Sequence, residues 1–161
     1  MFSSCNFDSN NQLIKKIENY CAYQERCHFE VKQKLSSLGV FGNKAEELIG
    51  VLIERGFINE TRFAKAFVRG KFRIKKWGKY RLIRELKTRK ISEWNIKNAL
   101  KEISEIEYLD CCKALVKRFW LSNKDNDLQI RKKKIWNALR YRGWENELII
   151  DNILELENQR E

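Results

Sequence analysis

The sequence contains no proline among its 161 residues, so it lacks the residue that most often interrupts a helix. It has a single histidine, His28, and its five cysteines form no C-x-x-C pair. This is poor material for a zinc site or a disulfide framework, so we predict no metal site, no cofactor and no covalent dimer. Free thiols indicate a reducing, cytoplasmic location, and we expect a monomer.

Long apolar runs and catalytic motifs are lacking as well. No stretch approaches the ~20 apolar residues of a membrane span, and the N-terminal "MFSSCNFDSNNQ" has neither the basic nor the apolar region of a signal peptide. Neither a G-x-x-x-x-G-K-[ST] loop nor an H-E-x-x-H motif occurs. The sequence therefore favours a binding protein over an enzyme, with no catalytic residues and no membrane partner.

Apolar residues recur at three- and four-residue spacing, which predicts an almost entirely α-helical chain. Three segments, beginning at Val31, Leu82 and Ile135, align with one another at offsets of 51 and 53 residues. Their matched apolar positions, in chain order, are Val31, Leu82 and Ile135; Leu35, Leu86 and Leu139; Val40, Ile91 and Trp144; Ala45, Ile96 and Ile149; Ile49, Leu100 and Ile153; and Leu52, Ile103 and Leu156. This recurrence predicts an all-α fold of tandem three-helix repeats that form an elongated, curved helical array.

The predicted organisation has four parts. Residues 1–12 are a flexible N-terminal tail, and repeats follow over 13–58, 59–104 and 105–161, the last with an acidic C-terminal end. The middle repeat is expected to have helices over 60–73, 79–89 and 92–103. Its helix starts are indicated by Asn59 and Ser92, because these side chains accept hydrogen bonds from free backbone amides. Gly39 and Gly143 suit left-handed helix ends in the outer repeats.

The charge is concentrated in one stretch, "RGKFRIKKWGKYRLIRELKTRK", which holds eleven of the 33 basic residues but a single acid. On a helix from residue 79, Leu82 and Leu86 share the core face, whereas Arg81 and Arg84 fall on the opposite side. A disordered tail needs no such separation, so the pattern predicts a folded basic surface that faces a polyanion or an acidic groove. The third repeat places "RKKK", residues 131–134, in the corresponding position.

The aromatic residues have two readings. Trp77 and Tyr80 lie among the cations and could stack on nucleic-acid bases. Aromatic residues between helices more commonly belong to the core, and this is the prediction for Trp136 and Trp144.

The stretch "LIERGFINETRFAKAFVRGKFRIKKWGKYRLIRELKTRKI" resembles the RecX family of bacterial regulators of the RecA recombinase. "GFINETRFAKAFV" is similar to the family's turn, acidic residue and Arg-Phe-Ala helix, and "WGKYRLIRELKTRKI" to its glycine and basic helix. The resemblance implies a modular fold of three-helix units and a non-enzymatic regulator of DNA repair, homologous recombination and the SOS response. It implies binding in the groove of the RecA–DNA filament, which limits filament growth, strand exchange and co-protease activity. Lys90 departs from the family, which tends to have glycine there.

The predicted contact surface for RecA and DNA consists of basic residues, with weak and salt-dependent affinity for DNA itself. Its members are Arg69, Lys71, Arg73, Lys75, Lys76, Lys79, Arg81, Arg84, Lys133 and Lys134. One alternative is a stand-alone DNA- or RNA-binding protein of the helix-turn-helix type, with one recognition helix in the major groove. A second is a protein-interaction solenoid in which charge reversal at Arg81 and Arg84 leaves partner binding unchanged.

Overall fold

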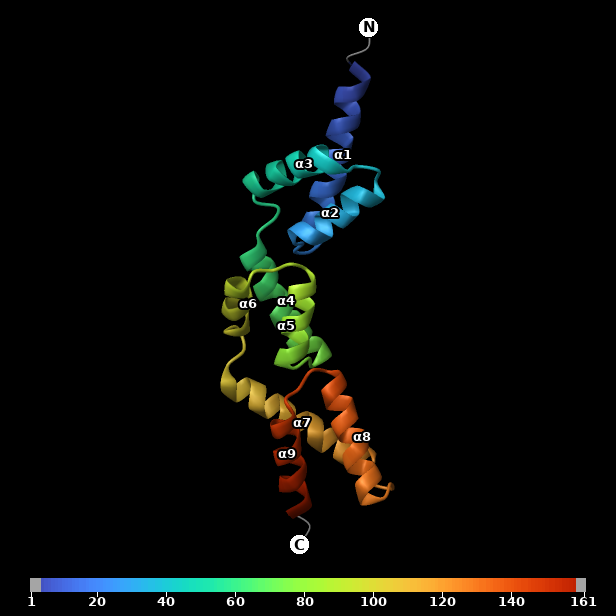
Figure 1. Ribbon diagram of the computed structural model, residues 1–161, viewed down its shortest axis with the longest axis vertical. Helices are drawn as coiled ribbons and strands as arrows, with labels where there is room; N and C mark the ends of the chain where they lie inside the picture. The colour runs from blue at the N-terminus through green and yellow to red at the C-terminus, as the bar shows by residue number, and fades with distance from the viewer. Residues whose placement is uncertain (1–3, 159–161) are drawn as a thin grey trace.

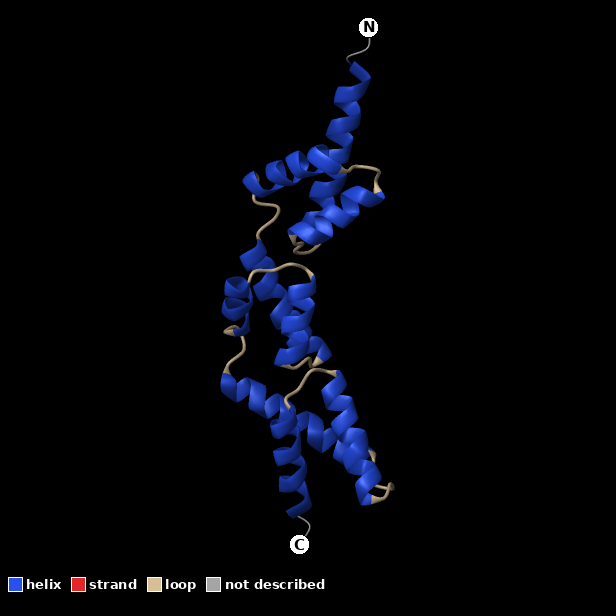
Figure 2. Ribbon diagram, in the orientation of Figure 1, coloured by secondary structure: helices blue, strands red, loops and turns tan. Residues whose placement is uncertain are grey.

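The computed structural model describes residues 4–158, and this part of the chain is helical throughout, without strands (Figure 2). Its helices are α1 (Ser4–Tyr23), α2 (His28–Ser37), α3 (Gly42–Glu54), α4 (Glu60–Lys75), α5 (Lys79–Thr88), α6 (Glu93–Leu100), α7 (Glu105–Ser122), α8 (Leu128–Tyr141) and α9 (Asn146–Asn158). They follow one another along an elongated, gently bowed molecule with the two ends of the chain far apart (Figure 1). The predicted all-α array is confirmed.

The first helix reaches into the segment predicted as a flexible N-terminal tail, residues 1–12. In the structure α1 begins at Ser4, and residues 1–3 lie outside the described residues. The physical reason is continuity, since neither proline nor glycine interrupts the chain before Gly39 and Ile17 anchors the same helix in the core.

The same turn ends the second helix of each triplet. In all three, the amide five residues further along donates to the carbonyl at the start of the turn: Val40 to Leu35 at 3.0 Å, Ile91 to Leu86 at 3.1 Å and Trp144 to Leu139 at 3.2 Å. These bonds define a Schellman motif, which requires a left-handed residue just before the final donor. Gly39 (φ 78°) and Gly143 (φ 84°) confirm the predicted role of glycine there, and Lys90 adopts the same conformation (φ 59°) despite its side chain.

The matched apolar positions form the core. All of them are buried except Leu100 and Leu156, which are half-buried and pack against the core cluster. Trp144 is fully buried as predicted, but Trp136 is 37% exposed, so the prediction that it belongs to the core is wrong. Its place on α8 lies beside the matched column rather than in it.

Two clusters divide the apolar core. One comprises side chains of α1–α3 and Ile58, whereas the other extends without a break from α4 through α9. Cys27 and Phe29, at the start of α2, contact the second cluster. Ion pairs reinforce this join: Arg62 binds Glu25 at 2.6 Å and Arg89 binds Glu30 at 3.3 Å.

The join between the second and third triplets uses backbone instead. The Gly78 amide donates to the Arg142 carbonyl at 2.8 Å, and the Tyr80 amide donates to the Gly143 carbonyl at 3.1 Å. A Cβ atom on Gly78 would lie 2.4 Å from the Gly143 oxygen, so only glycine permits this approach. Backbone contact of this kind fixes the relative position of α5 and the α8–α9 turn.

Stacked aromatic rings fill the same join. Tyr108 stacks against both Phe72 and Trp144, with ring centroids 5.9 and 4.5 Å away, and those two rings are 6.4 Å apart. The Tyr108 hydroxyl donates to Glu145 at 2.6 Å. Burial is the main cause that raises the pKa of Tyr108, and the hydrogen bond to Glu145 raises it further. The hydroxyl therefore remains protonated and able to donate.

Candidate functional site

One row of predicted contact residues on α4 is balanced by acids from the following segments. Glu102 accepts from Arg69 at 2.8 Å and pairs with Lys65 at 3.0 Å, and Arg73 reaches Glu107 at 3.3 Å. Hydrogen bonds from Lys65 and Arg69 lower the pKa of Glu102. Arg69 and Arg73 therefore bind α4 to the α6–α7 connection and the start of α7, and they contribute little unbalanced charge.

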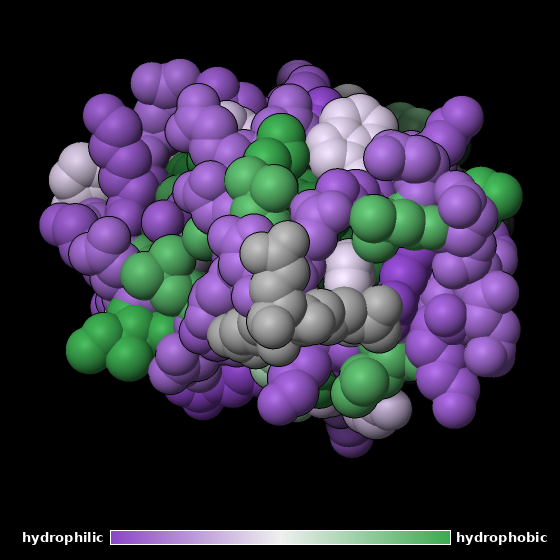
Figure 3. All heavy atoms as spheres, turned by 90° about the horizontal axis from the view of Figure 1, so that it is seen from below, coloured by the Kyte–Doolittle hydropathy of each residue, from purple (hydrophilic) through white to green (hydrophobic). Residues whose placement is uncertain are grey.

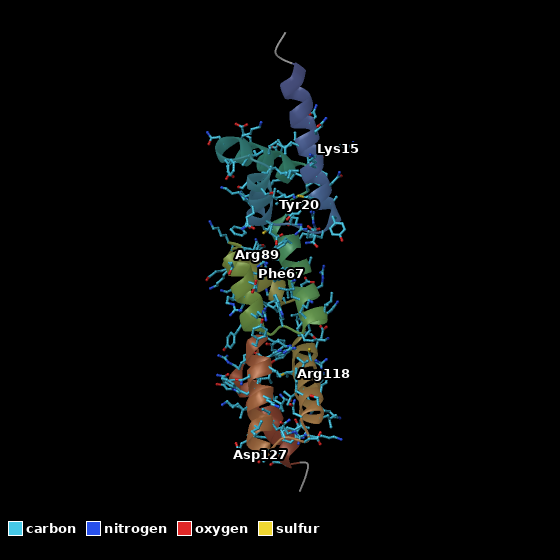
Figure 4. The ribbon with its side chains drawn as sticks, turned by 90° about the vertical axis from the view of Figure 1, so that its right-hand side faces the viewer. Lys15, Tyr20, Phe67, Arg89, Arg118 and Asp127 are labelled. Carbon is cyan, nitrogen blue, oxygen red and sulfur yellow. The ribbon has the colours of Figure 1, made fainter. Side chains whose placement is uncertain are left out.

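A second row of cations lies on aromatic rings. The Lys71 ammonium is 5.5 Å from the Phe67 ring centre and 5.3 Å from that of Trp77, and these two rings are 6.2 Å apart. The Arg89 guanidinium lies 5.0 Å over Phe67, and Figure 4 shows the two residues side by side. Such contacts are favourable and hold the charges against the protein surface. Arg89 was not among the predicted contact residues.

Arg81 does not point into solvent as predicted. Its guanidinium lies between the rings of Trp77 (4.2 Å) and Tyr141 (4.8 Å) and donates to the Tyr141 carbonyl at 3.0 Å. The side chain is half-buried. A helix considered alone places Arg81 outside, but the end of α8 packs against that side of α5. Arg81 thus joins the second and third triplets.

Lys76 and Lys79 also serve this join through their backbones. Lys76 ends α4 in a left-handed conformation (φ 55°), and its carbonyl accepts from the Trp144 indole at 3.0 Å. The Lys79 amide donates to the Tyr108 hydroxyl at 2.9 Å, and its ammonium lies 4.3 Å over the Tyr108 ring. Both residues carry charge near the surface, but their fixed contacts are structural.

Lys75 and Arg84 are different, because both are exposed and neither forms an ion pair within the part of the chain that the structure describes. Large apolar side chains lie near them: Ile74, next to Lys75 in sequence, is 76% exposed, and Tyr80, one helical turn before Arg84, is 57% exposed. Unbalanced cations next to exposed apolar groups are typical of a surface that binds a partner.

On α8 the predicted basic run splits in the same way. Lys133 and Lys134 are exposed, and Lys134 donates to the Asn126 side chain at 3.0 Å. Arg131, the first residue of the run, is 1% exposed and donates from Nε to the Trp120 carbonyl at 2.8 Å. Arg131 lies one helical turn before the core residue Ile135 and so on the same face of α8, whereas Lys133 and Lys134 lie on other faces. This spacing is the sequence signal for the division.

A cavity of about 310 Å³ lies next to the aromatic row, between the α1–α2 connection and α4. Phe67, Lys71 and Arg89 line one part of it, and Glu25 and Glu30 line another. Because carboxylates face the cations, the cavity does not present one sign of charge. Sequence reasoning did not find it, since its walls come from segments more than 30 residues apart.

Metal and membrane sites are not found in the described residues. Over 4–158, no three histidine, cysteine or acidic side chains converge on one point. None of the helices there is both long and apolar enough to cross a bilayer.

The fold and this surface define a class: an all-α protein of successive three-helix units that carries unbalanced cations on several of its helices. A family model described as "RecX, second three-helix domain" matches residues 59–100, the span of α4–α6. Over this segment the chain resembles the RecX family.

Two related proteins align with most of this sequence. Regulatory protein RecX of Lactobacillus gasseri is 27% identical over 143 residues, 88% of this chain and 52% of the relative. RecX of Prosthecochloris aestuarii is 26% identical over 90% of this chain and 93% of its own length. The chain thus spans about half the length of the Lactobacillus relatives and nearly all of the Prosthecochloris protein.

Solved structures share the fold. The crystal structure of RecX from Lactobacillus salivarius superposes with a TM-score of 0.76 and 23% identity, covering 93% of this chain and 97% of that one. A second RecX crystal structure gives a TM-score of 0.78 at 18% identity, over 89% of this chain and 72% of the other.

Proposed function

We propose that this chain is a negative regulator of the RecA recombinase that binds in the groove of the RecA–DNA filament. It limits filament growth, and through that strand exchange and co-protease activity, without catalysing a reaction and in the cytoplasm. The observation that carries this proposal is the set of exposed cations without ion-pair partners, Lys75, Arg84 and Lys133, on an elongated array that resembles the RecX family.

The ten residues predicted from the sequence divide into two groups in this proposal. Lys75, Arg84 and Lys133 make the main contacts, with Lys71 and Lys134 beside them. The remaining residues act indirectly, because their charges are paired or their groups hold the helices together: Arg69, Arg73, Lys76, Lys79 and Arg81. In this proposal, one group of basic residues holds the helices in position, and the other group supplies the charge that meets the partner.

The test is RecA's DNA-dependent ATPase with this protein added at or below stoichiometric ratio. The wild-type chain should inhibit it, and Lys75→Glu/Arg84→Glu should require roughly tenfold more protein, about 1.4 kcal/mol of lost binding. The matched control is Lys97→Glu/Lys101→Glu, the same charge change at two exposed positions on and beside α6, which should inhibit like the wild type.

Salt dependence separates the two components of the filament. If both residues contact phosphates, the Lys75→Glu/Arg84→Glu variant should lower the slope of log affinity for DNA against log salt by roughly 1.4–1.8. An unchanged slope together with lost inhibition assigns them to RecA. Absence of inhibition by the wild-type protein, or sequence-specific duplex binding without RecA, overturns the proposal.

A further inference from the structure

The last triplet has an apolar groove that shares only Lys133 with the proposed basic surface. It lies between α8 and α9, encloses about 480 Å³, and is lined by Trp136 on one side and by Ile150 and Leu154 on the other. These side chains are 37%, 46% and 46% exposed. Viewed from the C-terminal end, apolar patches interrupt a largely hydrophilic surface (Figure 3).

The repeat register shows that the fold does not require these residues. At the three matched positions the successive triplets hold Lys32, Ile83 and Trp136; Glu46, Lys97 and Ile150; and Gly50, Lys101 and Leu154. In the first triplet, Lys32 and Glu46 form an ion pair across the corresponding helices. Only the third triplet has large apolar residues at all three positions, although exposed apolar surface is unfavourable without a partner.

The rim of the groove carries both signs of charge. On α8, Lys133 is exposed without an ion-pair partner among the described residues, whereas Lys132 is paired with Glu157 at 2.6 Å. On α9, Glu147 and Asp151 lie exposed within a turn of the apolar residues. Acidic residues along one wall disfavour a nucleic-acid backbone or an anionic membrane, and a groove between two packed helices has the shape that accepts a third helix.

We propose that this α8–α9 groove docks an amphipathic helix of a protein partner. Two apolar side chains of that helix, three or four residues apart, pack between Trp136 and the pair Ile150 and Leu154. A carboxylate at its edge faces Lys133, the cation left unneutralised on the α8 wall. The partner is RecA itself, so this step rests on the proposed function and adds a contact that is apolar and independent of DNA.

The decisive variant is Trp136→Lys/Ile150→Glu, which installs the residues of the first triplet at their own matched positions. It should fold, because Lys32 and Glu46 occupy the same places in the same fold. Its affinity for purified RecA without DNA should fall roughly 30-fold, the usual effect of losing a central tryptophan anchor. The loss should persist at 0.5 M salt.

The matched control is Ile106→Glu/Leu109→Lys, an apolar-to-charged exchange at positions 74% and 44% exposed on α7, which should bind RecA like the wild type. A second variant, Leu154→Lys, copies the second triplet and should weaken binding roughly fivefold if the first variant folds poorly.

The outcomes separate the groove from the proposed function. Wild-type affinity and inhibition in the groove variants overturn the groove proposal and leave the regulator intact. Absence of any effect of the wild-type protein on RecA overturns both. Groove-dependent binding to vesicles of anionic lipid, with unchanged RecA binding, assigns the groove to a membrane and overturns the helix proposal.

Discussion

Replacement of Gly78 by alanine tests the backbone contact between the second and third triplets. The added methyl would lie 2.4 Å from the Gly143 oxygen, 2.6 Å from its carbonyl carbon and 2.7 Å from the Trp144 Cα atom. All three are backbone atoms, so no side-chain rotation can make room. Gly78 itself has φ −78°, a conformation that alanine adopts freely, and the cost therefore comes from the close approach alone.

The magnitude follows from the bonds that separation would break. The amides of Gly78 and Tyr80 lose their acceptors on Arg142 and Gly143, at 2.8 and 3.1 Å, and the Trp144 indole moves from Lys76. Each lost bond costs about 1 kcal/mol, and more where a buried group remains unpaired, so the total is about 3–5 kcal/mol. For a chain of this length that corresponds to a fall in Tm of roughly 6–20 °C.

Urea and thermal unfolding followed by circular dichroism measure this change, with Gly70→Ala as the control. Gly70 lies inside α4 with no atom near its missing Cβ, so alanine there should raise stability by about 0.5–1 kcal/mol. If Gly78→Ala unfolds within 1 kcal/mol of the wild type, the two triplets are not held by this contact and the reasoning fails.

Three further predictions concern stability. Lys90→Gly should stabilise by about 0.5–1 kcal/mol in urea unfolding, because the left-handed conformation strains a lysine; an unchanged midpoint contradicts this. Arg131→Ala should destabilise by about 2–4 kcal/mol in the same assay, since it removes the buried donor to Trp120, and a loss below 1 kcal/mol would refute that role. Burial raises the thiol pKa of Cys21 to about 11 and of Cys112 to about 12. The folded state thus favours the neutral thiols. Their contribution to the free energy of unfolding is complete below the unfolded thiol pKa of about 8.5 and is lost as the pH rises toward 11–12. Equal urea midpoints at pH 7.5 and 10.5 would contradict this.

The helical repeat could be predicted from the sequence because it depends on local periodicity. Leu82 and Leu86 are buried where the alignment places them, and Asn59 and Ser92 accept from the amides of Arg62 and Asn95 as N-caps. The helices of the middle triplet differ from their predicted ends by at most three residues.

The state of each charge could not be predicted in this way. Arg69 meets Glu102 across 33 residues of sequence, and Arg81 meets the Tyr141 carbonyl across 60. Such pairs depend on how helices pack, whereas the helical projection of α5 contains only the positions within one helix. The exposed Trp136 was wrongly assigned to the core. The matched apolar position belongs to Ile135, its neighbour, and not to Trp136 itself.

The unbroken core from α4 to α9 has a consequence for how the molecule comes apart. A chain divided after α6 would leave Phe72 without the rings of Tyr108 and Trp144 and would cut through a single continuous core cluster. A division before α4 would separate the two core clusters and uncover little beyond Cys27 and Phe29. Unfolding should follow the same line, with α1–α3 as one cooperative unit and the other six helices as a second.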